Sequence, residues 1–200
     1  MSKNVLLIFN VKRVNKFNTT LLWFLSLLIT GQTFLTLGID YGIRVMICTF
    51  SAALVSTLAV FINLKFDKYE NATALIISLS VVVGAGIYSI IQRGTYITTI
   101  FIVYIGSVAM IALYFRVKLV IIHTILLNLF LVVFYLFDPE GIMGPGYSVM
   151  NLMRTLLSMD LILIIIFFFT KWGNEYIMSA LDKEQSSNRL LMKLEDTKIP

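Results

Sequence analysis

The chain has 200 residues, of which 58% are hydrophobic and only 14% are charged, and its mean hydropathy is +0.90. Soluble domains normally carry about 25% charged residues, so this composition excludes an ordinary water-soluble fold and indicates an integral membrane protein. The formal net charge of +5 is explained by membrane topology in this class and gives no reason to expect a nucleic-acid partner.

The chain begins with a basic arm that contains Lys12, Arg13 and Lys16. We expect no cleavable signal peptide, because the apolar stretch at residues 5–9 is too short for a signal core. The first long apolar run, residues 19–37, is therefore predicted to be an uncleaved transmembrane helix.

Five more apolar runs follow, each near the roughly 20 residues that a transmembrane helix needs. They cover residues 43–64, 72–91, 96–114, 119–137 and 152–170. Short breaks at residues 38–42, 65–71, 92–94 and 116–118 separate the earlier runs, and a longer loop begins at Asp138. The predicted fold class is an all-α integral membrane protein whose residues 1–170 form a six-transmembrane-helix bundle.

The distribution of basic residues predicts the orientation of this bundle. Of the 16 Lys and Arg residues, only Arg44, Arg93 and Arg154 fall on the side of the membrane opposite the two termini. Because cytoplasmic loops are enriched in Lys and Arg, both termini are predicted to be cytoplasmic. The expected location is the inner (plasma) membrane, with multiple passes and membrane lipid as the surrounding partner.

The last segment, residues 171–200, differs from the rest because it is polar and helix-forming. Apolar or small residues recur there at a spacing of three or four, at Ile177, Ala180, Ser187, Leu191 and Leu194. This pattern is typical of a weak coiled-coil seam. We expect a cytoplasmic helix that continues the sixth span, pairs in a homodimer and relays a signal through Ile177, Leu191 and Leu194; a single solvated helix is the alternative.

The sequence contains no catalytic signature. The single histidine, His123, and the single cysteine, Cys48, exclude any site that needs two of either residue. His123 is expected to be a hydrogen-bonded packing residue near the cytoplasmic end of the fifth span, and Cys48 an inert buried thiol. We therefore expect no catalytic residues, no metal, no cofactor and no enzymatic activity.

Asp160 is the principal candidate for a binding residue. It lies inside the sixth apolar run, where a carboxylate costs about 2.5–3.5 kcal/mol on insertion scales and so requires a partner or a water-filled cavity. The candidate partners on the same side are Arg154, Arg44 and Arg93, and the four residues form the predicted ligand-binding set. The alternative is a structural ion pair or a protonated carboxyl that bonds to a neighbouring helix.

Several stretches resemble a known family. Residues 18–23 (Asn-Thr-Thr-Leu-Leu-Trp), 46–51, 112–117 and 170–176 are similar to the N-terminal membrane region of clostridial methyl-accepting chemotaxis proteins. Residues 187–197 resemble the helix that joins that region to the cytoplasmic signalling domain. The resemblance implies a dimeric six-helix sensor that transmits a stimulus along its last helix. Contact with the chemotaxis kinase complex would then occur only through an output domain, which we expect to be missing here.

Two other kinds of protein fit the same topology. One is a six-helix substrate-binding transporter subunit, such as the vitamin-binding component of an energy-coupling factor transporter. Such subunits dock through small residues spaced four apart on the first helix, a pattern that residues 21–28 lack. The other is the membrane region of a sensor histidine kinase or of a cyclic-nucleotide enzyme. An integral membrane enzyme receives the least support, because too few groups for a mechanism are present.

Overall fold

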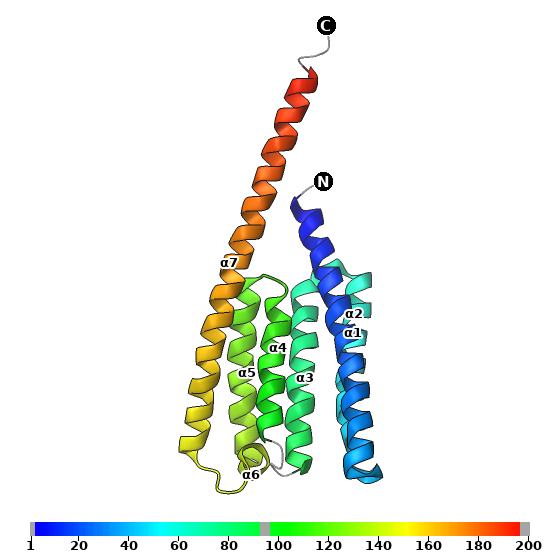
Figure 1. The fold of residues 1–200 in the computed structure, drawn as a ribbon, viewed down its shortest axis with the longest axis vertical. Coiled ribbons are helices and arrows are strands. Elements are labelled where there is room, and N and C mark those ends of the chain that lie inside the picture. The colour runs from blue at the N-terminus through cyan, green and yellow to red at the C-terminus, as the bar shows by residue number, and fades with distance from the viewer. Residues whose placement is uncertain (1–2, 93–96, 197–200) are drawn as a thin grey trace.

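The computed structural model describes residues 3–92 and 97–196, and no strand occurs among them. Long helices run alternately up and down side by side, and α1 begins at the same end of the bundle as α7 leaves it (Figure 1). In chain order the elements are α1 (Lys3–Leu37), α2 (Ile39–Lys65), the 3-10 turn η1 (Asp67–Tyr69), α3 (Glu70–Gln92), α4 (Ile97–Ala112), α5 (Val117–Phe137), α6 (Pro139–Met143) and α7 (Val149–Asp196).

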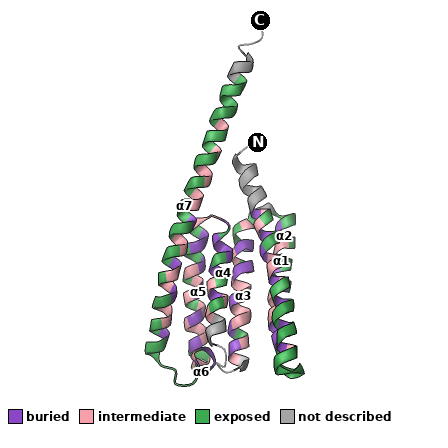
Figure 2. Cartoon of the chain, viewed as in Figure 1, coloured by how far each residue is buried: buried purple, intermediate pink, exposed green. Residues whose placement is uncertain are grey.

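Five helices of the described part are long and apolar enough to cross a membrane, namely α1, α2, α3, α5 and α7. Their outward faces are largely exposed and apolar, as lipid contact requires (Figure 2). The architecture is consistent with an all-α, multi-pass membrane protein. The expected fourth span, residues 96–114, corresponds to α4, which has 16 residues and reaches only about 24 Å at 1.5 Å per residue.

The first two helices begin earlier than the predicted spans, whereas α1 ends at the predicted residue, Leu37. α1 begins at Lys3, so the basic arm expected before the membrane is the first part of the same helix. The predicted turn at residues 38–42 reduces to Gly38 alone, whose φ of 89° lies in the region that glycine adopts freely. A single left-handed glycine is enough to end α1 and reverse the chain.

α3 occupies the middle of the bundle, where it contacts α1, α2, α4, α5 and α6. It approaches α2 closely at Gly84, where an added Cβ would lie 3.2 Å from the carbonyl oxygen of Cys48. The Ser56 and Ser80 hydroxyls, 2.8 Å apart, bond across the same pair of helices. Small residues and hydroxyl bonds are the usual means of helix association in lipid. Cys48 is buried there, as expected.

The loop that opens at Asp138 contains a short helix, α6, which the sequence interpretation did not anticipate. The Asp138 carboxylate caps it by accepting a bond from the Gly141 backbone N–H at 3.0 Å, and Pro139 occupies the first turn. α6 packs against α3 and α5. It closes the end of the bundle opposite the one where α7 leaves (Figure 1).

α7 is one continuous helix of 48 residues, about 72 Å long by helix geometry. Its first half packs against α4 and α5, and its second half extends well beyond the other helices, where most of its surface is exposed (Figures 1 and 2). The last apolar run and the polar tail through Asp196 are thus parts of one unbroken helix.

Candidate functional site

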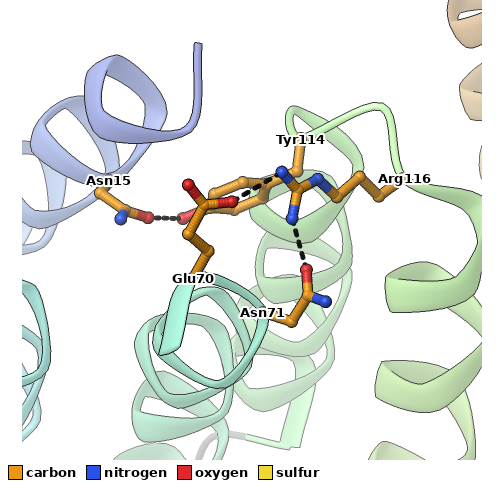
Figure 3. A network of polar contacts seen from close by, with 5 residues as sticks. All are labelled: Asn15, Glu70, Asn71, Tyr114 and Arg116. Atoms are coloured by element: carbon orange, nitrogen blue, oxygen red, sulfur yellow. Dashed lines mark hydrogen bonds and ion pairs between the residues drawn. The ribbon is translucent and has the colours of Figure 1, made fainter. Parts of the chain in front are cut away.

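The α4–α5 turn, residues 113–116, lies at the end of the bundle where α7 leaves it. Arg116 donates to the Glu70 carboxylate at 2.8 Å and to the Asn71 side-chain oxygen, and so holds the start of α3. The Tyr114 hydroxyl donates to the side-chain oxygen of Asn15 in α1 at 2.6 Å. Figure 3 shows these five side chains converging from α1, α3 and the turn.

The residue between Tyr114 and Arg116 is Phe115, and it contacts α7. Its ring lies directly over Gly173 of α7, so closely that a Cβ at that glycine would overlap the ring. Phe115 has a φ of 50°, a left-handed conformation that is strained for a bulky residue and persists only where the surroundings enforce it. The strained turn presents the ring to α7 at the point where the helix leaves the bundle.

Three consecutive residues therefore connect this turn to three helices: Tyr114 to α1, Phe115 to α7 and Arg116 to α3. We call residues 114–116 the coupling turn. The sequence analysis identified residues 116–118 only as a short break between spans. The available signal was the Tyr-Phe-Arg run itself, which places two side chains with hydrogen-bonding groups and one bulky aromatic ring in a short connection between spans.

The second part of the site is a groove between α5 and α7, with a volume of about 530 Å³. Its polar lining is a pair: Asn128 donates its side-chain N–H to the Asp160 carboxylate at 2.9 Å. The rest of the lining comprises Val120, Ile121, Thr124, Ile125, Leu163, Ile164, Phe167 and Phe168, and is apolar apart from the Thr124 hydroxyl, which donates within α5 to the Val120 carbonyl oxygen. Ile125 and Ile164 are more than half exposed, so the groove opens sideways towards the surrounding lipid.

Asp160 thus has Asn128, and no arginine, as its polar partner within the described part of the chain. Arg154 lies six residues earlier on α7, which places it roughly 120° around the helix, and it lines a different groove with residues of α4. Arg44 is exposed on α2 and lies 5.9 Å from the centre of the Tyr41 ring. Arg93 lies outside the described residues.

Neither Arg154 nor Arg44, both expected as partners of Asp160, contacts its carboxylate among the described residues. The pair that exists instead is rich in acceptors, because the Asn128 carbonyl oxygen is buried with no partner in the described part of the chain. Such a groove suits an apolar molecule that carries a hydrogen-bond donor or a positive charge. No cluster of three potential metal ligands occurs among the described residues.

The Asn128–Asp160 pairing is a contact that the sequence analysis missed, although a signal existed. Asn128 lies nine residues inside the fifth predicted span, and Asp160 lies ten residues inside the sixth when both are measured from the cytoplasmic side. At 1.5 Å per residue the two side chains share a depth of about 14–15 Å. Polar residues at one depth on sequential antiparallel helices are natural partners in lipid.

His123 and the three relay residues complete the predicted set. His123 is fully buried in α5, as a packing residue should be, but neither ring nitrogen has a hydrogen-bond partner among the described residues, so the expected bond is absent there. Ile177 is partly exposed and Leu191 is 57% exposed on the extended half of α7. The side chain of Leu194 lies outside the described part of the structure.

Comparison with known proteins finds no matching family model, no similar curated protein and no similar solved structure.

Proposed function

We propose that the chain is a membrane-embedded sensory module of the chemotaxis-receptor type, which relays a stimulus through α7 to a cytoplasmic output domain. The observation that carries the proposal is the continuity of α7. One helix holds the carboxylate of the α5–α7 groove at Asp160, contacts the coupling turn at Gly173 and then extends beyond the bundle to Asp196. The groove residue Asp160 and the extended half that would carry the signal are therefore parts of one continuous helix.

The relay needs a contact whose energy differs between two positions of α7. The Asn128–Asp160 hydrogen bond supplies one, since a donor that enters from the bilayer would compete with Asn128 for the carboxylate. The Phe115 ring contacts Gly173 about 13 residues, or roughly 20 Å, further along the helix. This contact would act as a pivot, so that a displacement of α7 at Asp160 moves the extended half of the helix.

The proposed topology has six spans, with both termini on the cytoplasmic side of a bacterial inner membrane. It is supported by the position of the basic residues at the end where α7 leaves, among them Lys65, Lys68 and Lys118, and by the alternating course of the helices (Figure 1). α4 would be the short fourth span. The exposed Leu190, Leu191 and Met192 on the tail support a homodimeric contact there, with the chemotaxis kinase complex reached only through the output domain.

The test joins the whole chain to the cytoplasmic domain of a chemoreceptor and inserts one to seven alanines after Ala180. If α7 relays rotation or displacement, kinase activity varies with the number of inserted residues and returns near seven, because each residue rotates the helix by about 100°. The matched control places the same insertions in the α6–α7 loop between Gly146 and Tyr147, where they leave the helical phase of the tail unchanged.

Output that ignores the helical phase would contradict the relay. In the same fusion, Asp160→Asn is expected to shift kinase activity, since it weakens acceptance from Asn128. A fusion that inserts stably but is insensitive both to phase and to Asp160→Asn would favour the alternative, a substrate-binding transporter subunit.

A further inference from the structure

A second groove, between α1 and α2, lies on the other flank of the bundle and combines positive charge with apolar walls. It has a volume of about 510 Å³ and is lined by Lys12, Lys16, Thr19, Thr20, Trp23, Thr57, Val60, Phe61 and Leu64. No acidic residue is among these lining residues. The lysines occupy the start of the apolar stretch of α1, which is the depth of the lipid headgroups.

The polar groups gather at the end of the groove nearest the start of α1. Lys12 and Lys16 are separated by one helical turn and share a face of α1. Next to them, the Thr19 hydroxyl is shielded from solvent and has no hydrogen-bond partner among the described residues. Two ammonium groups and a free hydroxyl are the donors that a phosphate group accepts from.

The inner end of the groove suits the remainder of a lipid. The Trp23 ring N–H donates to the Thr57 hydroxyl at 2.9 Å, which connects α1 to α2 and fixes the indole as the floor of the polar part. Beyond it, Leu27 on α1 and Leu54 on α2 are each more than half exposed. These side chains lie about one turn from Trp23 and Thr57 on the same faces and continue the groove as an apolar track.

We propose that this groove binds one anionic phospholipid, with the headgroup phosphate between Lys12, Lys16 and Thr19 and an acyl chain along Trp23 and Phe61. The charge of the groove selects an anionic over a zwitterionic lipid. The proposal is independent of the sensory function, because it concerns α1 and α2 and not the α5–α7 groove.

Trp23 provides the readout, since Trp172 is the only other tryptophan and Trp172→Phe removes it. The full chain is placed in phosphatidylcholine vesicles that contain a small fraction of phosphatidylglycerol with brominated acyl chains, which quench a neighbouring indole. We expect brominated phosphatidylglycerol to quench Trp23 at far lower mole fractions than brominated phosphatidylcholine. Lys12→Gln with Lys16→Gln should weaken this preference roughly tenfold or more.

Two charge-matched variants separate a site from general attraction. Lys118→Gln with Lys171→Gln removes the same charge from the same end of the bundle but from α5 and α7, and should leave the preference intact. Lys12→Arg with Lys16→Arg keeps the charge and should also retain it, which guards against misfolding.

Equal quenching by the two brominated lipids would overturn the proposal. So would an equal loss of lipid preference in the Lys12→Gln/Lys16→Gln variant and the Lys118→Gln/Lys171→Gln variant. Displacement by millimolar inorganic phosphate would assign the groove to a free anion instead. Weak quenching by both lipids, together with cross-linking through Thr20→Cys, would assign it to a second copy of the chain.

Discussion

The two halves of α7 have the same backbone geometry but are helical for different reasons. In the membrane half, Leu152, Met159 and Leu163 are buried against the bundle, whereas in the extended half Leu190 and Leu191 are more than half exposed. Isolated helices are marginal in water, and tertiary packing usually supplies most of their stability. The membrane half is therefore held by its neighbours, and the extended half depends on helix propensity and on any partner that pairs with it.

This contrast suggests a division of labour within one helix. The membrane half has a polar contact with α5 at Asp160 and a steric contact with the coupling turn at Gly173, so its position depends on specific neighbours. The extended half has few contacts in the monomer and can follow a change in that position at little cost. Four sets of variants test whether the boundary between the two halves lies at the coupling turn.

Gly173→Ala should have the largest effect. Its Cβ would overlap the ring of Phe115, and overpacking of this kind costs about 1–3 kcal/mol. Thermal unfolding of the purified protein in detergent measures the loss. The matched control is Gly31→Ala on α1, where nothing lies within 4 Å of the new Cβ, and there alanine should stabilise the helix by up to about 1 kcal/mol. Adding Phe115→Ala should restore the thermal stability of the Gly173→Ala variant. If stability is not restored, the steric overlap at Gly173 does not involve Phe115.

Arg116→Met should be next, because it leaves the Glu70 carboxylate without its ion partner. The two side chains are 28% and 14% exposed, so we expect a loss of about 1.5–2 kcal/mol in unfolding free energy, the lower part of the range for a hydrogen bond to a charged group. Arg44→Met, which removes an exposed arginine at the opposite end, should change the same thermal transition little. Equal effects of the two substitutions would show that the coupling turn contributes no special support.

The Asn128–Asp160 bond should contribute less. Polar bonds between membrane helices average about 0.6 kcal/mol and reach about 1.7 kcal/mol in double-mutant cycles. A cycle of Asn128→Leu and Asp160→Leu, measured by reversible unfolding in mixed micelles, should give a coupling energy in that range. A coupling near zero would mean that the carboxylate is stabilised by water in the groove and not by Asn128.

Leu191→Ser in the extended half should have the smallest effect on the membrane bundle, within about 0.5 kcal/mol, as for exposed positions generally. Hydrogen exchange offers the complementary measurement: amides of residues 155–170 should exchange slowly, and those of residues 180–192 much faster. Slow exchange in both segments, at a concentration where the protein is monomeric, would show that the extended half is as stable as the membrane half and would contradict the comparison.

Much of the architecture was predictable because it depends on composition along the chain. The apolar runs that became α2, α3, α5 and α7 were located to within a few residues, since about 20 apolar residues have no alternative to a membrane helix. Boundaries were less predictable where local signals were ambiguous. α1 extends to Lys3 through the basic arm, and α6 forms where Asp138 caps a short turn inside the predicted loop.

The candidate site was predicted only in part. Asp160 was identified because an intramembrane carboxylate is conspicuous in any sequence. Its partner was assigned to arginines on the basis of charge, whereas the structure pairs it with Asn128, because position around the helix decides which side chains meet. Arg154 shares the helix with Asp160 but faces another groove.

Hydropathy and helix propensity act locally, so the order of the residues was enough to predict a helical membrane protein with a polar helical extension. The packing of the helices was needed to show that Tyr114, Phe115 and Arg116 connect three helices, that Asn128 meets Asp160, and that Lys12 and Lys16 border a groove with Trp23. Those arrangements depend on the rotation and register of packed helices, which arise from many weak contacts between segments distant in the chain.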